Sequence, residues 1–253
     1  MVGKILTDAG LDPTIILGAT ASFWKANFRI GGNLPAGRQE YLVIEADEFN
    51  DNYMSLNPDI TVLTNIEFDH PEFFKDFMAY QNSFRNFLHK TTQVIIANLN
   101  DKNSKETLAE KPNTEENFFP PVIDFSKNLV DFNLKISGKH NILNASAAYN
   151  LGLNLRINPE TIKKSLQEFP GIGRRMEYLG EINGAKIFSD FAHHPTAIKV
   201  ATEQIKNQFP DSKIWVIYQP HMFSRTKALF NEFVKVFKNL IVNLKLLNKK
   251  LNI

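Results

Sequence analysis

The chain has 253 residues, of which 43% are hydrophobic and 22% charged, a composition typical of one large or two smaller globular domains. It contains no cysteine, which excludes a disulfide framework, a thiolate nucleophile and zinc held by cysteine. The formal charge of +2 depends on five lysines after Val234, and without them the net charge is −3. The basic balance is therefore no argument for nucleic-acid binding.

Targeting signals are not evident in the sequence. No apolar run approaches the ~20 residues of a membrane span, and the residues after Met1 do not resemble a signal peptide. We therefore expect a cytoplasmic protein that binds neither nucleic acid nor membranes.

The first elements predict the second half of a βαβ unit. Apolar residues recur at helical spacing over 2–9, Gly10 has the place of a C-cap, and the run 14–18 predicts a strand. The sequence contains no G-x-x-x-x-G-K-[ST] phosphate-binding loop, which would sit before this helix.

Two short apolar runs, 41–44 and 60–63, predict strands buried on both faces of a parallel sheet. The first run ends in Glu45-Ala46-Asp47-Glu48, and the second leads to Asp69-His70. Ligands bind beyond the carboxyl ends of such strands, so Glu45 and His70 are candidates for a divalent-cation site beside a phosphorylated substrate. The alternative is that they are solvated turn residues.

The remaining elements follow from periodicity and turn residues. Before residue 173 we expect an aromatic-faced helix from 73 to 88, strands at 93–97 and 129–136, and helices at 101–108, at 138–153 and from Asn158. The strand at 129–136 is expected to be a half-exposed antiparallel edge, and Asn158 and Pro159 to be N-cap and N1. After residue 173 we expect a hairpin turning at 183–184, a helix at 195–207, a strand at 213–218 and a helix ending near 237.

These elements suggest domains at 1–172 and 173–237, separated by a glycine-rich break, and a tail at 238–253. The tail uses only five residue types and lacks caps and turn residues. We interpret it as a segment that is out of frame or lies beyond a break in the gene.

Two polar clusters suit a nucleotide. His140, Asn141 and Asn144 lie on the first turns of a predicted helix, where side chains and exposed N–H groups meet a base or phosphate. Arg174 and Arg175 follow the glycine-rich break and suit phosphate clamping; the alternative is a surface salt-bridge pair.

Two further clusters follow predicted strands, so we expect them at the same sheet end. Asp190 there suits a ribose hydroxyl, and His193 or His194 a substrate carboxylate; zinc would need further ligands at defined spacing. His221 and Arg225, four residues apart, suit a carboxylate-bearing substrate or a helix-start cap network.

Six ordered motifs resemble those of the Mur ligase family, and the resemblance covers nearly all of residues 1–237. They are EADE at 45–48, TNIEFDH at 64–70, GKHNILNA at 138–145, GRRME at 173–177, DFAHHPT at 190–196 and QPHMFSRT at 219–226. The resemblance implies a mainly parallel α/β ATPase domain followed by an incomplete Rossmann-like domain. It also implies a ligase that uses ATP to activate a carboxylate as an acyl phosphate.

The last two motifs imply UDP-N-acetylmuramate and L-alanine as substrates, with a murein tripeptide as the alternative amino substrate. Glu45 and His70 would ligate magnesium, while His140, Asn141, Asn144, Arg174, Arg175 and Asp190 would bind ATP. His193, His221 and Arg225 would meet the amino acid or the acyl phosphate.

The chain departs from the family pattern in lacking the UDP-sugar domain, the phosphate-binding loop and the rest of the C-terminal domain. We therefore expect an internal fragment with weak ATP binding and no alanine-dependent phosphate release. A non-catalytic remnant that binds a nucleotide or a partner chain is the competing hypothesis.

Overall fold

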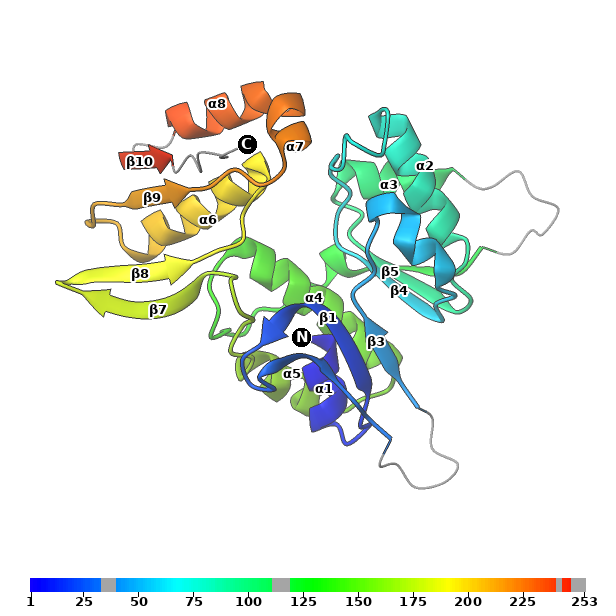
Figure 1. The fold of residues 1–253 in the computed structure, drawn as a ribbon. Helices are drawn as coiled ribbons and strands as arrows, with labels where there is room; N and C mark the ends of the chain where they lie inside the picture. The colour runs from blue at the N-terminus through cyan, green and yellow to red at the C-terminus, as the bar shows by residue number, and fades with distance from the viewer. Residues whose placement is uncertain (33–39, 111–118, 240–242, 247–253) are drawn as a thin grey trace. The chain divides into compact units, whose positions relative to one another are not determined.

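The computed structural model describes residues 1–32, 40–110, 119–239 and 243–246 (Figure 1). The chain divides into two compact units: unit 1 comprises Met1–Phe68 and Lys75–Gly173, and unit 2 comprises Asp69–Phe74 and Arg174–Ile253. Residues 69–74, hereafter the 69–74 segment, therefore interrupt unit 1 in the sequence but pack within unit 2.

Unit 1 is a mixed α/β structure with two three-stranded sheets. One sheet has the order β2-β1-β3, in which β1 (Thr14–Ala21) pairs antiparallel with β2 (Ala26–Arg29) and parallel with β3 (Leu42–Ile44). The other is entirely parallel and has the order β4-β5-β6, built from Ile60–Leu63, Val94–Ala97 and Val122–Asp124. The mainly parallel α/β fold expected from the sequence is confirmed.

The two acid-terminated runs were predicted to form strands buried on both faces, and this is wrong for the first. In β3, Leu42 is 61% and Ile44 is 38% exposed, whereas one face of β4 (Thr61, Leu63) is buried and its other face (Ile60, Val62) is half-buried. β3 is an edge strand that pairs with β1 alone among the described residues, and β4 belongs to the other sheet. A short apolar run does not reveal how many of its faces will be covered.

The core of unit 1 is organised around α4 (Lys139–Asn154). Ala145 and Ala148 pack in a cluster with α1 (Val2–Asp8) and α5 (Pro159–Gln167), and Ala147 packs in a second cluster with β5. Small side chains let the helix approach neighbours on more than one side, which explains the alanine-rich sequence there.

Helix starts in unit 1 follow their local sequence signals. Asn158 accepts a hydrogen bond from the backbone N–H of Glu160 and Pro159 occupies the first turn of α5, as predicted. Asp101 caps α3 (Lys102–Ala109) by accepting from the Ser104 N–H at 2.8 Å. Two short 3₁₀ helices, η1 (Phe49–Ser55) and η2 (Phe125–Lys127), complete the unit.

The predicted edge strand at 129–136 is absent, and β6 at Val122–Asp124 was missed. Val130, Phe132 and Leu134 instead pack from an irregular stretch of chain against the helical core, and the Val130 N–H donates to Ser146 Oγ at 2.9 Å. Alternating burial therefore arises here without a strand partner.

The predicted helix at 73–88 begins later, as α2 (Phe77–Leu88), capped by Asp76. Its buried aromatic residues are Tyr80 and Phe87, while Met78 is 63% exposed. The helix therefore has the expected aromatic face, and Met78 is not part of its buried side.

Unit 2 begins with the predicted hairpin, formed by β7 (Glu177–Ile182) and β8 (Ala185–Ser189). Asn183 and Gly184 have φ values of 50° and 81° at its turn. Two successive positive values are typical of the two-residue turn that Asn-Gly favours.

The rest of unit 2 consists of α6 (Pro195–Gln208), β9 (Trp215–Tyr218), α7 (Phe223–Ala228), α8 (Phe230–Asn239) and β10 (Asn243–Leu246). Ile198, Tyr218 and Phe233 form its buried cluster. The single helix predicted to end near 237 is two helices that meet at Leu229.

β10 lies within the low-complexity tail and pairs in parallel with β9. Residues 240–242 and 247–253 of that tail lie outside the described residues. Within the described ranges, no helix has the length and apolar character needed to cross a membrane.

Candidate active site

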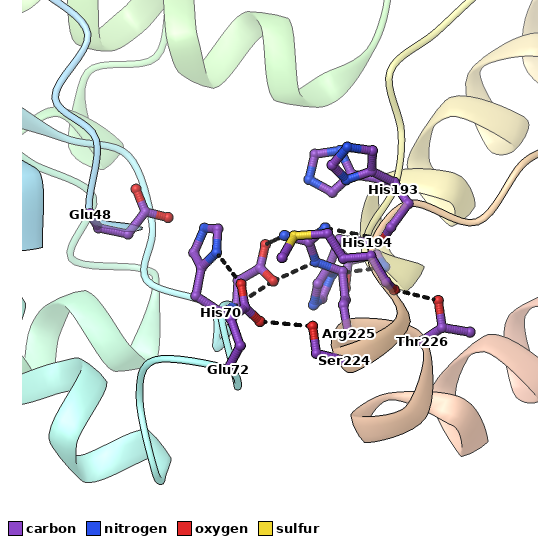
Figure 2. Close-up of polar contacts among 12 residues, drawn as sticks. Glu48, His70, Glu72, His193, His194, Ser224, Arg225 and Thr226 are labelled. Atoms are coloured by element: carbon purple, nitrogen blue, oxygen red, sulfur yellow. Dashed lines mark hydrogen bonds and ion pairs between the residues drawn. The ribbon is translucent and has the colours of Figure 1, made fainter. Parts of the chain in front are cut away.

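The most buried charged side chain described in unit 2 is Arg225, on α7, which is 2% exposed. Its Nε donates to Asp69 Oδ1 at 2.6 Å and its Nη2 to Asp69 Oδ2 at 3.0 Å (Figure 2). Parallel hydrogen bonds between a guanidinium and a carboxylate are among the strongest in proteins, and they fix the plane of the arginine. A third hydrogen bond joins Arg225 Nη1 to the His221 carbonyl at 3.4 Å.

The 69–74 segment makes a second polar connection to α7. Glu72 Oε2 accepts from Ser224 Oγ at 3.2 Å, and Glu72 Oε1 lies 3.2 Å from His70 Nδ1 (Figure 2). Burial acts to raise the pKa of Asp69, but hydrogen bonds from Arg225 and the His70 N–H hold it below its usual value. The segment therefore presents ionised Asp69 to α7 at neutral pH.

Three predicted site residues, His193, His221 and Arg225, are brought together in unit 2. The rings of His193 and His221 are 5.7 Å apart, and each also contacts the ring of Phe191. They do not share a sheet end as expected, because β8 and β9 belong to different two-stranded sheets. The three residues come together because the loop after β8 lies next to the loop after β9.

His193 is held as a neutral imidazole of defined tautomer. Its Nδ1 lies 2.8 Å from the Phe191 carbonyl, which can only accept, so Nδ1 carries the proton and Nε2 the lone pair. Burial lowers the pKa of His193, and the charge of Arg225 adds to that effect against the opposing backbone hydrogen bond.

His194 has a different role, because it caps α6: its Nδ1 accepts from the Thr196 N–H at 3.3 Å. No group of three or more His, Asp or Glu side chains that could hold a metal ion occurs in the part of the chain that the structure describes.

Arg174 occupies a strained backbone position with φ of 56°. Its guanidinium lies over the ring of Phe191, 4.6 Å from the centroid, and its carbonyl accepts from the Phe191 N–H. Arg175 is exposed next to it. Asp190 accepts from the N–H groups of Met176 and Ala192 at 2.8 and 2.7 Å, so it organises the loop that carries these residues.

The remaining predicted residues lie in unit 1. Glu45 follows β3, and its Oε2 accepts from the Gly18 N–H of β1 at 2.9 Å. His140, Asn141 and Asn144 lie on the first turns of α4, as expected, and Asn141 Nδ2 donates to the Ser137 carbonyl. His70 lies in unit 2, so its predicted meeting with Glu45 at a metal ion stays a prediction.

Two residues of this arrangement, Asp69 and Glu72, were not among the site residues predicted from the sequence. Asp69 stands inside a recognised motif, directly before His70, but its partner Arg225 is 156 positions away. The motif order offered a weak signal for Asp69, and no local pattern marked Glu72.

Comparison with known proteins identifies two domains. The Mur ligase middle domain matches residues 31–128, and the domain described as "Mur ligase, glutamate ligase domain" matches residues 174–250. The UDP-N-acetylmuramate–L-alanine ligase of Caldicellulosiruptor bescii is 36% identical over 93% of this chain and 55% of its own length.

The chain belongs to the Mur ligase family. It spans about half the length of the curated Mur ligases it matches, and the C-terminal match extends into the low-complexity tail.

Two solved Mur ligase structures share the fold. The UDP-N-acetylmuramate-alanine ligase MurC of Thermotoga maritima has a TM-score of 0.71 at 21% identity, covering 98% of this chain and 63% of that chain. A murein peptide ligase of Psychrobacter arcticus has a TM-score of 0.67 at 22% identity, covering 98% and 66%.

Proposed function

We propose that the chain carries the middle and C-terminal parts of a ligase that uses ATP to join L-alanine to UDP-N-acetylmuramate in peptidoglycan precursor synthesis. The observation that supports this most is the identity of 36% over 93% of the chain to a ligase of that name. In the proposed reaction the γ-phosphoryl group of ATP passes to the substrate carboxylate and ADP leaves. The amino group of alanine then attacks the acyl carbon, so that the amide C–N bond forms, the C–O bond to phosphate breaks, and inorganic phosphate and a proton are released. A cytoplasmic location accords with soluble nucleotide substrates and is part of the proposal.

The cluster in unit 2 provides the groups for the amino-acid half of this reaction. An incoming amino group must be unprotonated to attack, and the Nε2 lone pair of neutral His193 can accept its proton. His221 lies beside it, and Arg225, fixed by Asp69, contributes positive charge near the anionic acyl phosphate. These side chains are assigned to catalysis as a group.

The ATP half is assigned to residues of both units. Arg174 and Arg175 would meet the phosphates, Asp190 the ribose, and His140, Asn141 and Asn144 the nucleotide. Asp190 already accepts two backbone hydrogen bonds, but a carboxylate has room for a further donor. Guanidinium charges suit a phosphoryl-transfer transition state, whose charge spreads over several oxygens.

Magnesium is assigned to Glu45 and His70. Mg²⁺ commonly takes one or two protein ligands and completes its shell with water and substrate phosphates, so two donors suit it. The Glu72 carboxylate beside His70 Nδ1 favours the tautomer with its lone pair on Nε2, which suits ligation. Bound magnesium would neutralise charge on the transferring phosphoryl group.

The alternative amino substrate is a murein tripeptide, since a murein peptide ligase shares this fold. The two substrates can be distinguished by nuclear magnetic resonance of the ¹⁵N-labelled chain with ATP and Mg²⁺. We expect L-alanine, but not D-alanine, to shift resonances of His193, His221 and Arg225. A response to the tripeptide alone would favour the alternative.

A non-catalytic remnant is the second class of function to be tested. In the same titration we expect ATP to shift the resonances of Arg174 and of its neighbour Phe191, and the variant Arg174→Gln to weaken the response of Phe191. The exposed lysine variant Lys199→Gln on α6 serves as the control. A chain whose spectrum responds to neither ATP nor an amino substrate would contradict the proposed ligase.

A further inference from the structure

Phe191 lies at the centre of the cluster in unit 2, although neither the family motifs nor the chemistry above gives its side chain a role. Its ring has the Arg174 guanidinium 4.6 Å from its centroid, the His193 ring at 4.7 Å and the His221 ring at 5.7 Å. Arg174 is assigned to phosphate and the two histidines to the amino-acid end. One aromatic ring therefore touches residues of both halves of the proposed reaction.

The backbone of Phe191 holds the same neighbours. Its N–H donates to the Arg174 carbonyl at 2.8 Å, and its carbonyl lies 2.8 Å from His193 Nδ1. Asp190 and the N–H groups of Met176 and Ala192 fix the chain on either side. These hydrogen bonds fix the backbone of Phe191. The position of its ring therefore does not depend on the side chains that it contacts.

An exposed arginine has many rotamers, and an aromatic face selects the few that place the cation over the ring. A guanidinium stacked in this way still directs its N–H edges outward in a plane, the geometry in which it binds phosphate oxygens. The positive φ of Arg174 further limits the direction in which its side chain leaves the backbone.

We propose that Phe191 is a positioning residue, which holds the Arg174 guanidinium ready for the ATP phosphates and sets its distance from His193 and His221. This inference rests on the proposed function for its ligand. The ring acts through Arg174 and the two imidazoles and does not itself touch the reacting atoms.

The test compares Phe191→Leu, which removes the aromatic face but keeps an apolar side chain, with the conservative variant Phe191→Tyr. A ring-current shift of the Arg174 δ-methylene protons reports stacking without any ligand. We expect this shift in the wild-type chain and in Phe191→Tyr, and its loss in Phe191→Leu. The dispersion of the amide spectrum shows whether each variant is folded.

Titration with ATP and Mg²⁺, followed by the same spectra, then measures the effect on binding. We expect Phe191→Leu to weaken ATP binding about two- to fivefold, from the usual strength of an exposed cation–π contact. In the Arg174→Gln background the same change should have no further effect, because the residue it positions is gone. The pH titration of His193 should shift in Phe191→Leu and stay close to wild type in Phe191→Tyr.

Wild-type ATP affinity in a folded Phe191→Leu chain would overturn the inference and leave the proposed function standing. Equal losses in the wild-type and Arg174→Gln backgrounds would also overturn it, since they would mean a general structural effect. A wild-type chain that shows the Arg174 ring-current shift but binds no ATP would overturn both the proposed function and the ligand given to Arg174. If both variants are unfolded, Phe191 is a core residue and the positioning role is rejected.

Discussion

Asp69 and Arg225, 156 positions apart in the sequence, form a two-point ion pair in which the guanidinium is 2% exposed. A buried charge of this kind depends on its partner, because the opposite charge offsets most of the free energy lost on its desolvation. The pair therefore connects the 69–74 segment to α7, and α7 carries one of the proposed catalytic groups.

Replacing Asp69 with alanine should leave the guanidinium of Arg225 buried without its counter-charge. We expect unit 2 to lose about 3–5 kcal/mol of stability, measured by urea unfolding followed through the aromatic signals of its cluster. The matched control is Glu106→Ala, which breaks an exposed pair with Lys102 and should cost under ~0.5 kcal/mol. Equal stability of Asp69→Ala and wild type would show that the ion pair does not stabilise unit 2.

Asp124, at the end of β6, should contribute to the acid sensitivity of unit 1. Burial acts to raise its pKa, but hydrogen bonds from Ser126 and the Leu99 N–H hold the pKa below its usual value. A depressed folded-state pKa adds stability above about pH 4, which is lost as pH falls through the folded value. Asp124→Asn should therefore lose about 1–3 kcal/mol at pH 7 and progressively less below pH 4.

Urea unfolding between pH 3 and pH 7 measures the difference between Asp124→Asn and wild type. The exposed variant Glu203→Gln on α6 serves as the control, with an expected change under ~0.5 kcal/mol throughout. A difference that stays constant across this range would refute the role given to Asp124.

Gly152 of α4 should resist replacement by alanine, although alanine is the better helix former. A Cβ at this position would lie 2.7 Å from Ile162 Cδ1 of α5, a residue with no exposed surface. Crowding of about 1–3 kcal/mol outweighs a helix-propensity gain of about 1 kcal/mol, so we expect a net loss near 1 kcal/mol. Thermal unfolding of Gly152→Ala provides the measurement.

The matched experiment repeats the change in an Ile162→Ala background, where the three crowding side-chain carbons of Ile162 are absent. There Gly152→Ala should be neutral or stabilising relative to Ile162→Ala alone. The same loss in both backgrounds would mean that contact with Ile162 is not the cause.

Glu45 should contribute to divalent-cation binding through its carboxylate. We expect Glu45→Gln to weaken Mn²⁺ binding at least tenfold, since an amide is a poorer ligand for a hard cation than a carboxylate. Water-proton relaxation of the chain titrated with Mn²⁺ measures this, with the exposed variant Glu106→Gln as control. Unchanged affinity in Glu45→Gln would remove Glu45 from the metal site.

Most helices and the hairpin could be predicted because their signals are local. Asn158-Pro159 starts α5 with its own side chain and ring, and Asn183-Gly184 supplies the two positive φ values of its turn. The predictions that were wrong concern features that tertiary packing determines. Alternation at 129–136 reflects packing on the helical core without a strand partner, and the exposure of β3 depends on which of its faces other elements cover.

The candidate site shows the same division between local and distant signals. His193, His221 and Arg225 could be singled out because each follows an apolar strand in a short polar motif. Asp69 could not be matched with Arg225, because nothing in the sequence records a contact over such a separation. The stacking of Arg174 on Phe191 likewise depends on the positive φ of Arg174. A positive φ cannot be predicted at a residue other than glycine from the sequence alone.

The placement of the 69–74 segment affects how the protein can be divided for expression. A cut after Gly173 follows the sequence boundary, but a fragment that starts at Arg174 would contain Arg225 without Asp69 and Ser224 without Glu72. Such a fragment would bury the Arg225 guanidinium without its counter-charge and is therefore a poor candidate for independent folding. A rearranged chain that joins residues 69–74 to the second part through a flexible linker would preserve these contacts.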